Sequence, residues 1–232
     1  MSCMNAKILE TFHSIQGEGK YAGVAQVFVR FFECNMHCTW CDTPHSIGDT
    51  TRHYKEYALE QLFQETQELW QDCHSVSLTG GEPLVQSEFL KEFLPLLHEA
   101  DFPTYLDTNG TLPQALSDVI EHLDIIAMDI KLPSSTKCRP YWDEHEQFLK
   151  IAQEKDIFIK TVISKDTDLA DIKRAVALVD KIAPETLFIL QPNYFEMNDG
   201  VVAKCQEFQN YCSKILDDVR ILPQTHKFMK LR

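Results

Sequence analysis

The chain of 232 residues lacks long apolar runs and an excess of basic residues. Residues 1–12 do not contain the apolar stretch of a signal peptide, and no segment approaches the roughly 20 apolar residues that cross a membrane. The 22 Lys and Arg residues stand against 35 Asp and Glu residues, which gives a formal net charge of −13. A nucleic-acid binder normally presents a basic stripe, and none is present. We therefore expect a cytoplasmic protein without nucleic-acid or membrane partners.

Linkers, low-complexity stretches and internal repeats are also missing. This continuity predicts a single domain spanning residues 1–232. An apolar content of 44% is enough for a sizeable core that needs no disulfide framework. Eight cysteines without an export signal indicate a reducing compartment.

Three of the cysteines are grouped as Cys34-x-x-x-Cys38-x-x-Cys41. Thiolates are soft ligands that suit iron–sulfur clusters, zinc and copper(I). Three of them can hold three irons of a cubane cluster and leave the fourth iron open for a small molecule, whereas a fourth cysteine would close the cluster. His37 and His45 each offer a fourth ligand for zinc, so a zinc site remains an alternative.

Short β-rich runs alternate with amphipathic stretches along the chain. Strands are expected at Lys7–Phe12, Val27–Phe32, Ser75–Thr79, Thr104–Thr108, Ile125–Ile130, Ile157–Ile163, Leu187–Leu190 and Val219–Leu222. Helices are expected at Leu59–Trp70, Phe89–Glu99, Gln114–His122, Asp143–Glu154, Leu169–Ile182 and Val201–Leu216. Such alternation predicts an α/β fold with right-handed βαβ units and a mostly parallel sheet, arranged as a partial (β/α)-type barrel.

Polar clusters follow most of the expected parallel strands. They are the cysteine loop (residues 33–44) and the segments 79–83, 108–110, 129–135, 191–193 and 223–227. Barrel and open α/β enzymes build their sites at the carboxyl ends of parallel strands. Turn formation alone explains the glycines and prolines but not the repeated polar side chains. The pattern therefore favours an enzyme.

The segment Thr79-Gly80-Gly81-Glu82-Pro83 is the second motif. Its two glycines allow the backbone to approach a ligand closely. Together with the cysteine triad, in this order, it resembles the radical S-adenosylmethionine (SAM) superfamily. The resemblance implies that Cys34, Cys38 and Cys41 hold a [4Fe–4S] cluster whose open iron binds SAM.

Further segments resemble one family within that superfamily, over essentially the whole chain. They are Ser14-Ile15-Gln16-Gly17-Glu18-Gly19, Arg30, Cys41-Asp42-Thr43, Leu190-Gln191-Pro192 and His226-Lys227. These features resemble the 7-carboxy-7-deazaguanine synthases. The resemblance implies conversion of 6-carboxy-5,6,7,8-tetrahydropterin to 7-carboxy-7-deazaguanine with loss of ammonia, a step toward queuosine and related deazapurines.

The resemblance also implies how the reaction proceeds. A 5′-deoxyadenosyl radical formed from SAM removes hydrogen from C6 of the pterin, the ring contracts, and SAM is regenerated. The cluster and SAM carry the chemistry, so no catalytic acid–base pair is expected. Mg²⁺ is an expected cofactor, and a homodimer and an external electron donor are expected partners.

Site residues carry over by position. The expected SAM contacts are Trp40, Cys41, Asp42, Gly81, Glu82, Asp129, Ile130, Lys131, Gln191, Pro192 and Asn193. The expected substrate contacts are Ile15, Gln16, Gly17, Glu18, Arg30, Thr79, His226 and Arg232. Thr43 is the expected Mg²⁺ ligand, which suits an ion that takes one or two protein oxygens and completes its shell with ligand oxygens and water.

Physical chemistry supports several substrate assignments. The planar fork of Arg30 matches a carboxylate, Gln16 offers a donor and an acceptor to a ring edge, and Glu18 can accept from a guanidine-like face. Arg232 lies six positions after His226 and would contribute its terminal carboxylate. The family more often ends in proline, and a frayed terminus is the alternative.

Three other functions remain open at this stage. A glycyl-radical activase has a similar size, but it leaves the QGEG segment and the final His-Lys pair unexplained. A non-catalytic iron–sulfur or zinc protein is a second alternative, which metal and acid-labile sulfide analysis separates. A catalyst acting on a related pterin with another ring substituent is the third.

Overall fold

The structure, a computed structural model, describes residues 5–48 and 54–231. Its centre is one nine-stranded sheet in the order β3-β1-β2-β4-β5-β6-β7-β8-β9. The strands are β1 (Ala6–Ile15), β2 (Ala25–Phe31), β3 (Lys55–Tyr57), β4 (Ser75–Gly80), β5 (Thr104–Thr108), β6 (Ile125–Asp129), β7 (Asp156–Ile163), β8 (Phe188–Pro192) and β9 (Val219–Ile221). β1 pairs antiparallel with β2 and β3, and every other pairing is parallel. The predicted partial barrel with a mostly parallel sheet is confirmed, and the sheet does not close.

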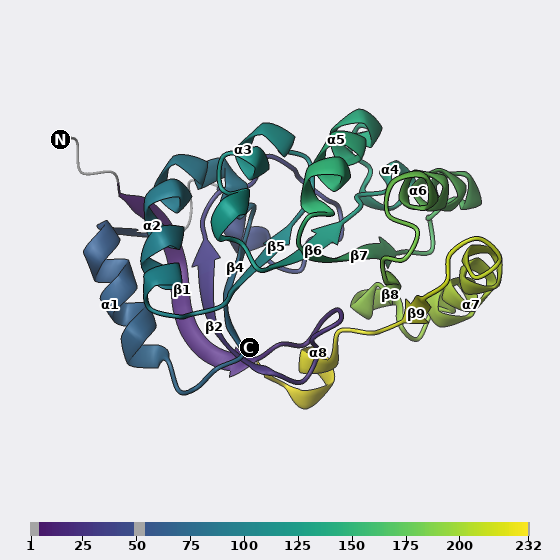
Figure 1. The fold of residues 1–232 in the computed structure, drawn as a ribbon. Coiled ribbons are helices and arrows are strands. Elements are labelled where there is room, and N and C mark those ends of the chain that lie inside the picture. Colours follow the sequence, from purple (N-terminus) through teal and green to yellow (C-terminus); the bar gives the residue numbers. More distant parts are fainter. Residues whose placement is uncertain (1–4, 49–53, 232) are drawn as a thin grey trace.

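Helices cover the convex face of the sheet (Figure 1). They are α1 (Leu59–Leu69), α2 (Ser87–Glu99), α3 (Pro113–Ser117), α4 (Pro133–Thr136), α5 (Trp142–Ala152), α6 (Leu169–Ile182) and α7 (Val201–Cys212). Short 3-10 turns are η1 (Pro44–Ser46), η2 (Pro83–Gln86), η3 (Ile120–His122) and η4 (Tyr194–Glu196). The main core lies between this helical layer and the sheet, where Leu78, Phe93 and Val176 are fully buried. In the described part of the chain, no helix combines the length and apolar character needed to span a bilayer.

The concave face carries one short helix, α8 (Thr225–Met229), drawn in yellow beneath the arch of the sheet (Figure 1). The last strand β9 leads directly toward it. The concave side near the carboxyl ends of the strands therefore stays open for a site, with α8 closing one flank.

The element bounds mostly follow the sequence pattern. α6 matches its predicted range, whereas the helix expected at 114–122 divides into α3 and η3. The division occurs because Val119 leaves the helical conformation, with φ −126° and ψ −6°. The edge strand β3 was not predicted. It is only three residues long, and it carries the exposed Lys55 and Glu56, so it has no strand-like alternation.

Candidate active site

A cavity of about 350 Å³ lies on the concave side, where the parallel strands end. Most residues predicted to bind a ligand line it: Ile15, Gln16, Gly17, Glu18, Arg30, Cys34, Cys38, Trp40, Cys41, Asp42, Thr43, Thr79, Gly81, Asp129, Lys131, Gln191, Asn193 and His226. The fold thus brings together residues from both halves of the sequence. The predicted cluster, SAM and substrate segments share one space.

Three predicted site residues do not line the cavity, and a fourth is not described. Ile130 is fully buried in the core, and Pro192 lies in β8 without lining the cavity. The Glu82 side chain is also fully buried and accepts hydrogen bonds from the backbone of Leu84 and from Thr108 and Asn109, so its carboxylate holds the fold rather than facing the cavity. Arg232 lies outside the described residues.

The cysteine loop leaves β2 and folds back on its own start. Glu33, with φ 82°, donates its backbone N–H to Ser46 at 2.8 Å, and the Cys34 N–H reaches the Ile47 carbonyl at 3.2 Å. Cys34, Cys38 and Cys41 are half-buried free thiols lining the cavity. This closed loop presents three soft ligands to one space, which fits an iron–sulfur cluster.

Burial governs the pKa of two of these thiols, Cys34 and Cys38. It raises the pKa of Cys34 to about 11, with the Glu82 carboxyl adding to the shift, and it raises the pKa of Cys38 to about 12 despite the opposing Lys131 ammonium. Bound metal deprotonates a coordinating thiol outright. Iron bound by Cys34 and Cys38 would therefore displace the protons that burial otherwise retains on their sulfur atoms.

The two glycines of the second motif approach the end of β2 and the start of the cysteine loop. Gly80 has φ +131°, and a Cβ there would lie 2.1 Å from the Phe31 carbonyl oxygen. A Cβ on Gly81 would lie 2.1 Å from the carbonyl oxygen of Glu33. The Gly81 N–H donates to the Phe31 carbonyl at 3.1 Å and the Glu82 N–H donates to the Glu33 carbonyl at 2.9 Å, so the segment after β4 packs backbone to backbone on the end of β2 and the start of the cysteine loop. The small residues serve this contact in addition to any approach to a ligand.

The cysteine loop is also tied to the segment after β6. The Trp40 indole N–H donates to the Ser135 carbonyl at 2.9 Å, and the Lys131 ammonium lies 5.0 Å from the centre of the Trp40 ring. Lys131 also pairs with Asp129 at 2.7 Å. Oδ1 of Asp129 and Oε1 of Gln191 are buried without a hydrogen-bond partner. Both oxygens are acceptors that a polar ligand in the cavity would satisfy.

On the substrate side, two predicted contacts already have partners within the protein. Arg30 Nε binds Glu10 Oε1 at 2.9 Å, and its guanidinium lies 5.8 Å from the Phe12 ring centre. The Gln16 side chain donates to Gln26 at 2.9 Å and accepts from the Glu18 backbone at 3.0 Å. Gln16 therefore holds the shape of its loop, and because it also lines the cavity its ring-edge contact stays a prediction.

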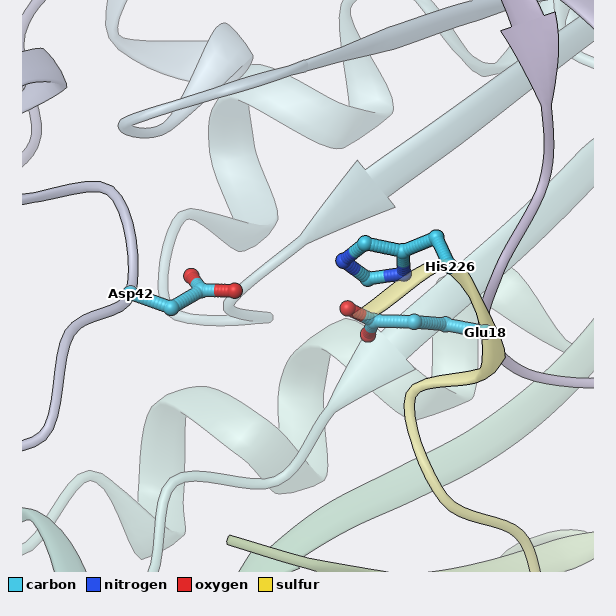
Figure 2. A group of neighbouring side chains, drawn as sticks. All are labelled: Glu18, Asp42 and His226. Carbon is cyan, nitrogen blue, oxygen red and sulfur yellow. The ribbon is translucent and has the colours of Figure 1, made fainter. Parts of the chain in front are cut away.

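Glu18, Asp42 and His226 point toward one another from three different segments (Figure 2). One ligand atom from each lies within 4.8 Å of the others, a spacing that a metal ion can use. However, Lys160 pairs with Glu18 at 2.8 Å and Lys227 pairs with Asp42 at 3.2 Å. Because two ammonium groups already balance the two carboxylates, the trio is better suited to hydrogen-bond donors than to a further cation.

Glu18 stays ionised at this position. Burial alone would raise its pKa, but the Lys160 ammonium and the hydrogen bond from Gln224 hold the pKa of Glu18 well below its usual range. Burial lowers the pKa of His226, with Glu18 opposing that shift. The pair thus offers a carboxylate and an imidazole that burial keeps largely neutral.

Gly17 allows α8 to close the cavity. Thr225 donates its backbone N–H to the Gly17 carbonyl at 2.8 Å, and its hydroxyl contacts the same oxygen at 3.1 Å. A Cβ at Gly17 would lie 2.1 Å from Nδ1 of His226. The absence of a side chain is therefore what admits His226 against the QGEG segment.

The lining residues to which the sequence assigned no role include Lys160, Asp107 and Gln224. Lys160 had a visible signal, a single charge inside the apolar run of β7. Asp107 follows the apolar residues of β5 and immediately precedes the Thr108-Asn109-Gly110 turn. Gln224, which binds both Glu18 and Asp42, lies in the polar segment 223–227 after the last expected strand, but nothing in the sequence assigned its side chain a role.

Comparison with known proteins identifies the class. The family model of the radical SAM superfamily matches residues 29–203. The chain belongs to this superfamily and is a radical SAM enzyme, and membership implies a [4Fe–4S] cluster and SAM as cofactors. The prediction of an enzyme is confirmed, and a non-catalytic zinc or electron-transfer protein is no longer supported.

Full-length relatives identify the family. A 7-carboxy-7-deazaguanine synthase of Geobacter sulfurreducens is 39% identical over 249 aligned positions covering 99% of both chains. Another protein with that name, from Thermoplasma acidophilum, is 34% identical over 96% of both chains. The chain belongs to the 7-carboxy-7-deazaguanine synthase family. The crystal structure of QueE from Escherichia coli shares the fold, with a TM-score of 0.68 and 22% identity over 96% of this chain and 95% of that one.

Proposed function

We propose that this protein converts 6-carboxy-5,6,7,8-tetrahydropterin to 7-carboxy-7-deazaguanine with loss of ammonia. The observation that carries the proposal is one cavity that joins the cysteine triad to a polar substrate wall, in a chain similar over its full length to synthases of that name. We take the whole chain, residues 1–232, to act as one radical SAM domain. The continuous sheet supports this reading.

Two ends of the cavity suit two parts of such a substrate. Arg30 offers a planar guanidinium to a carboxylate once Glu10 yields its hydrogen bond. Glu18 offers an ionised acceptor to ring N–H groups, beside His226. The protein thereby binds and orients the ring, and α8 limits access of water from one flank.

The cofactor residues fit their expected groups. Cys34, Cys38 and Cys41 would hold the cluster, and the unpartnered oxygens of Asp129 and Gln191 leave acceptors for SAM. When bound, the cluster and SAM supply the one-electron chemistry that begins with hydrogen abstraction at C6 of the pterin. Lys131, held beside Trp40 and Asp129, contributes a positive charge near the cysteine loop.

Mg²⁺ at Thr43 is part of the same proposal. The Thr43 side chain lines the cavity 3.9 Å from Cys41 Sγ and next to Asp42 in sequence. One protein hydroxyl with substrate oxygens and water matches the way Mg²⁺ is usually bound. The proposal also includes a homodimer and an external electron donor, and both rest on the family resemblance.

An anaerobic assay tests the function. Reconstituted protein receives SAM, a reductant, Mg²⁺ and 6-carboxytetrahydropterin, and mass spectrometry follows the products. Formation of 7-carboxy-7-deazaguanine without matching loss of SAM is the expected result. Slow SAM cleavage without that product would mean a different substrate.

The matched controls replace one cysteine at a time. Cys38→Ala removes a cluster ligand and is expected to abolish SAM cleavage and cluster content. Cys73→Ala removes a buried cysteine that does not line the cavity and is expected to retain both. Full activity with an intact cluster in Cys38→Ala would contradict the ligand assignment.

A further inference from the structure

Lys160 is a buried lysine in the interior of β7, with a side chain only 7% exposed. Its ammonium lies 2.8 Å from Glu18 Oε2 and 3.0 Å from Asp107 Oδ1. A buried lysine is costly unless its charge is paired, and here two carboxylates from other segments supply the pairing. The chain therefore places one positive charge between the loop after β1 and the end of β5.

Glu18 is the carboxylate that Lys160 shares with the cavity. Its other partners are the side-chain amides of Gln191, at 3.1 Å, and Gln224, at 2.7 Å. A carboxylate has about four lone-pair positions, and these contacts use three of them. One acceptor position is left on a side chain that lines the cavity.

The second partner of Lys160 connects to the cavity in a different way. Asp107 accepts a hydrogen bond from Thr79 at 3.2 Å, and both residues line the cavity wall. Lys160 thus holds two carboxylates that both face the ligand space. Burial would lower the pKa of Lys160, but Asp107 and Glu18 hold it well above its usual value, so the ammonium stays charged.

We propose that Lys160 is a positioning residue that keeps Glu18 charged and fixed in the cavity, and so selects a pterin edge that presents N–H donors. This inference rests on the proposed function and adds a residue to it. A neutral side chain at position 160 would leave Glu18 buried without its cation. Such a carboxylate either takes up a proton, which turns an acceptor into a donor, or moves toward solvent.

A purely structural role for Lys160 predicts a different outcome. Loss of a structural ion pair lowers stability without changing which ring edge the cavity prefers. The test therefore compares two ligands, 6-carboxytetrahydropterin and an analogue that carries a carbonyl oxygen in place of the 2-amino group. The ratio of the two affinities shows whether Glu18 still acts as a hydrogen-bond acceptor. A uniform loss of folded protein does not change this ratio.

A matched control exists on the same two segments. Lys20, in the loop after β1, pairs with Asp156 at the start of β7 at 2.6 Å, but it does not line the cavity. Lys20→Met removes an ion pair between the same segments. It is expected to leave the affinity ratio unchanged.

Lys160→Met is expected to raise the KM for 6-carboxytetrahydropterin by at least about tenfold, with a smaller change in kcat, and to reduce the preference over the carbonyl analogue. Lys160→Arg keeps the positive charge and should therefore recover part of the wild-type KM and part of the preference over the carbonyl analogue. Because Lys160 acts through Glu18, the double variant Lys160→Met with Glu18→Gln should be no worse than the poorer single variant.

The proposed role of Lys160 is overturned if Lys160→Met keeps the wild-type KM and the wild-type preference over the carbonyl analogue. If the wild type makes product in that case, the proposed synthase function still stands. It is also overturned if the effects of the two substitutions multiply. If Lys160→Met does not fold, Lys160→Gln removes the charge but keeps a donor. An unchanged preference of Lys160→Gln for 6-carboxytetrahydropterin over the carbonyl analogue would likewise overturn the positioning role of Lys160.

Discussion

At the scale of single residues, Gly17 shows how closely two distant segments meet. Gly17→Ala places a Cβ 2.1 Å from His226 Nδ1, so His226 must shift from its position beside Glu18 and Asp42. Because small displacements of groups that orient a substrate have large effects, we expect kcat/KM for the pterin to fall about 10- to 100-fold. Steady-state kinetics at matched cluster content measures the change.

Gly23→Ala is the control for this substitution. Gly23 lies in the same loop with φ +103° and with no atom within 4 Å of an added Cβ. It therefore reports the cost of backbone strain alone, about 1 to 3 kcal/mol of stability. Equal losses of kcat/KM in both variants would argue against steric displacement of His226.

The sequence could identify Gly17 and Glu18 but not their surroundings. The QGEG segment is recognisable by resemblance, whereas the partners of its side chains come from β2, β7, β8 and α8. Gln16 was expected at a ring edge because an amide suits one. In the structure it also donates to Gln26, since β1 and β2 pair antiparallel and bring both amides together, a register that turn chemistry decides, and the ring-edge contact stays a prediction.

At the scale of elements, the contact between β4 and the cysteine loop leaves no room for side chains. Gly81→Ala would place a Cβ 2.1 Å from the Glu33 carbonyl oxygen, which is backbone and cannot rotate away. The start of the cysteine loop must then shift. We expect the variant to lose most of its iron and acid-labile sulfide after anaerobic reconstitution.

Gly200→Ala provides the comparison for that loss. Gly200 precedes α7 with φ +85°, and an added Cβ there meets no atom within 4 Å. Normal iron and sulfide content is expected in this variant. Normal content in Gly81→Ala as well would show that β4 does not fix the loop.

His145 links two of the strand-end turns from helix α5. Its Nδ1 contacts the Gly110 carbonyl at 3.0 Å, and its Nε2 accepts the Lys131 backbone N–H at 3.2 Å. Burial lowers the pKa of His145 to about 4, from about 6.5 in an unfolded chain. The unfolded state therefore binds more protons between these values, and this contribution to stability is present above pH 6.5 and lost as pH falls toward 4.

His145→Gln removes the titration while keeping a neutral polar side chain. The wild type should be more stable than the variant at pH 8 and should lose about 2 kcal/mol of that advantage at pH 5. Thermal unfolding of both proteins at the two pH values measures the difference. A gap that stays constant with pH would contradict a neutral buried imidazole.

Among the elements, periodicity predicted α6 and the parallel strands because each buries one face over several turns or residues. It could not predict where α3 ends, since Leu116 and Val119 are both buried and keep the apolar pattern running across the break. Nor could it place Lys160 opposite Glu18, because that pairing depends on which strands lie beside each other.

At the scale of the whole molecule, the end of the chain returns to its beginning. Leu231 lines the cavity and donates its backbone N–H to the His226 carbonyl at 3.0 Å. A short Gly-Ser extension after Arg232 is therefore expected to raise the KM for the pterin. The same extension at the N-terminus serves as the control, and an unchanged KM in both would remove the C-terminal residues from the site.

Order along the chain also sets an order in time. The ribosome completes the cysteine loop early in translation, whereas Gln224, His226 and Leu231 emerge only after all nine strands of the described sheet have been made. A nascent or prematurely terminated polypeptide that stops before residue 224 carries all three cluster cysteines and no C-terminal wall. The three cluster cysteines can therefore meet iron before the residues of the C-terminal wall exist, while binding of a ligand against that wall must wait for those residues.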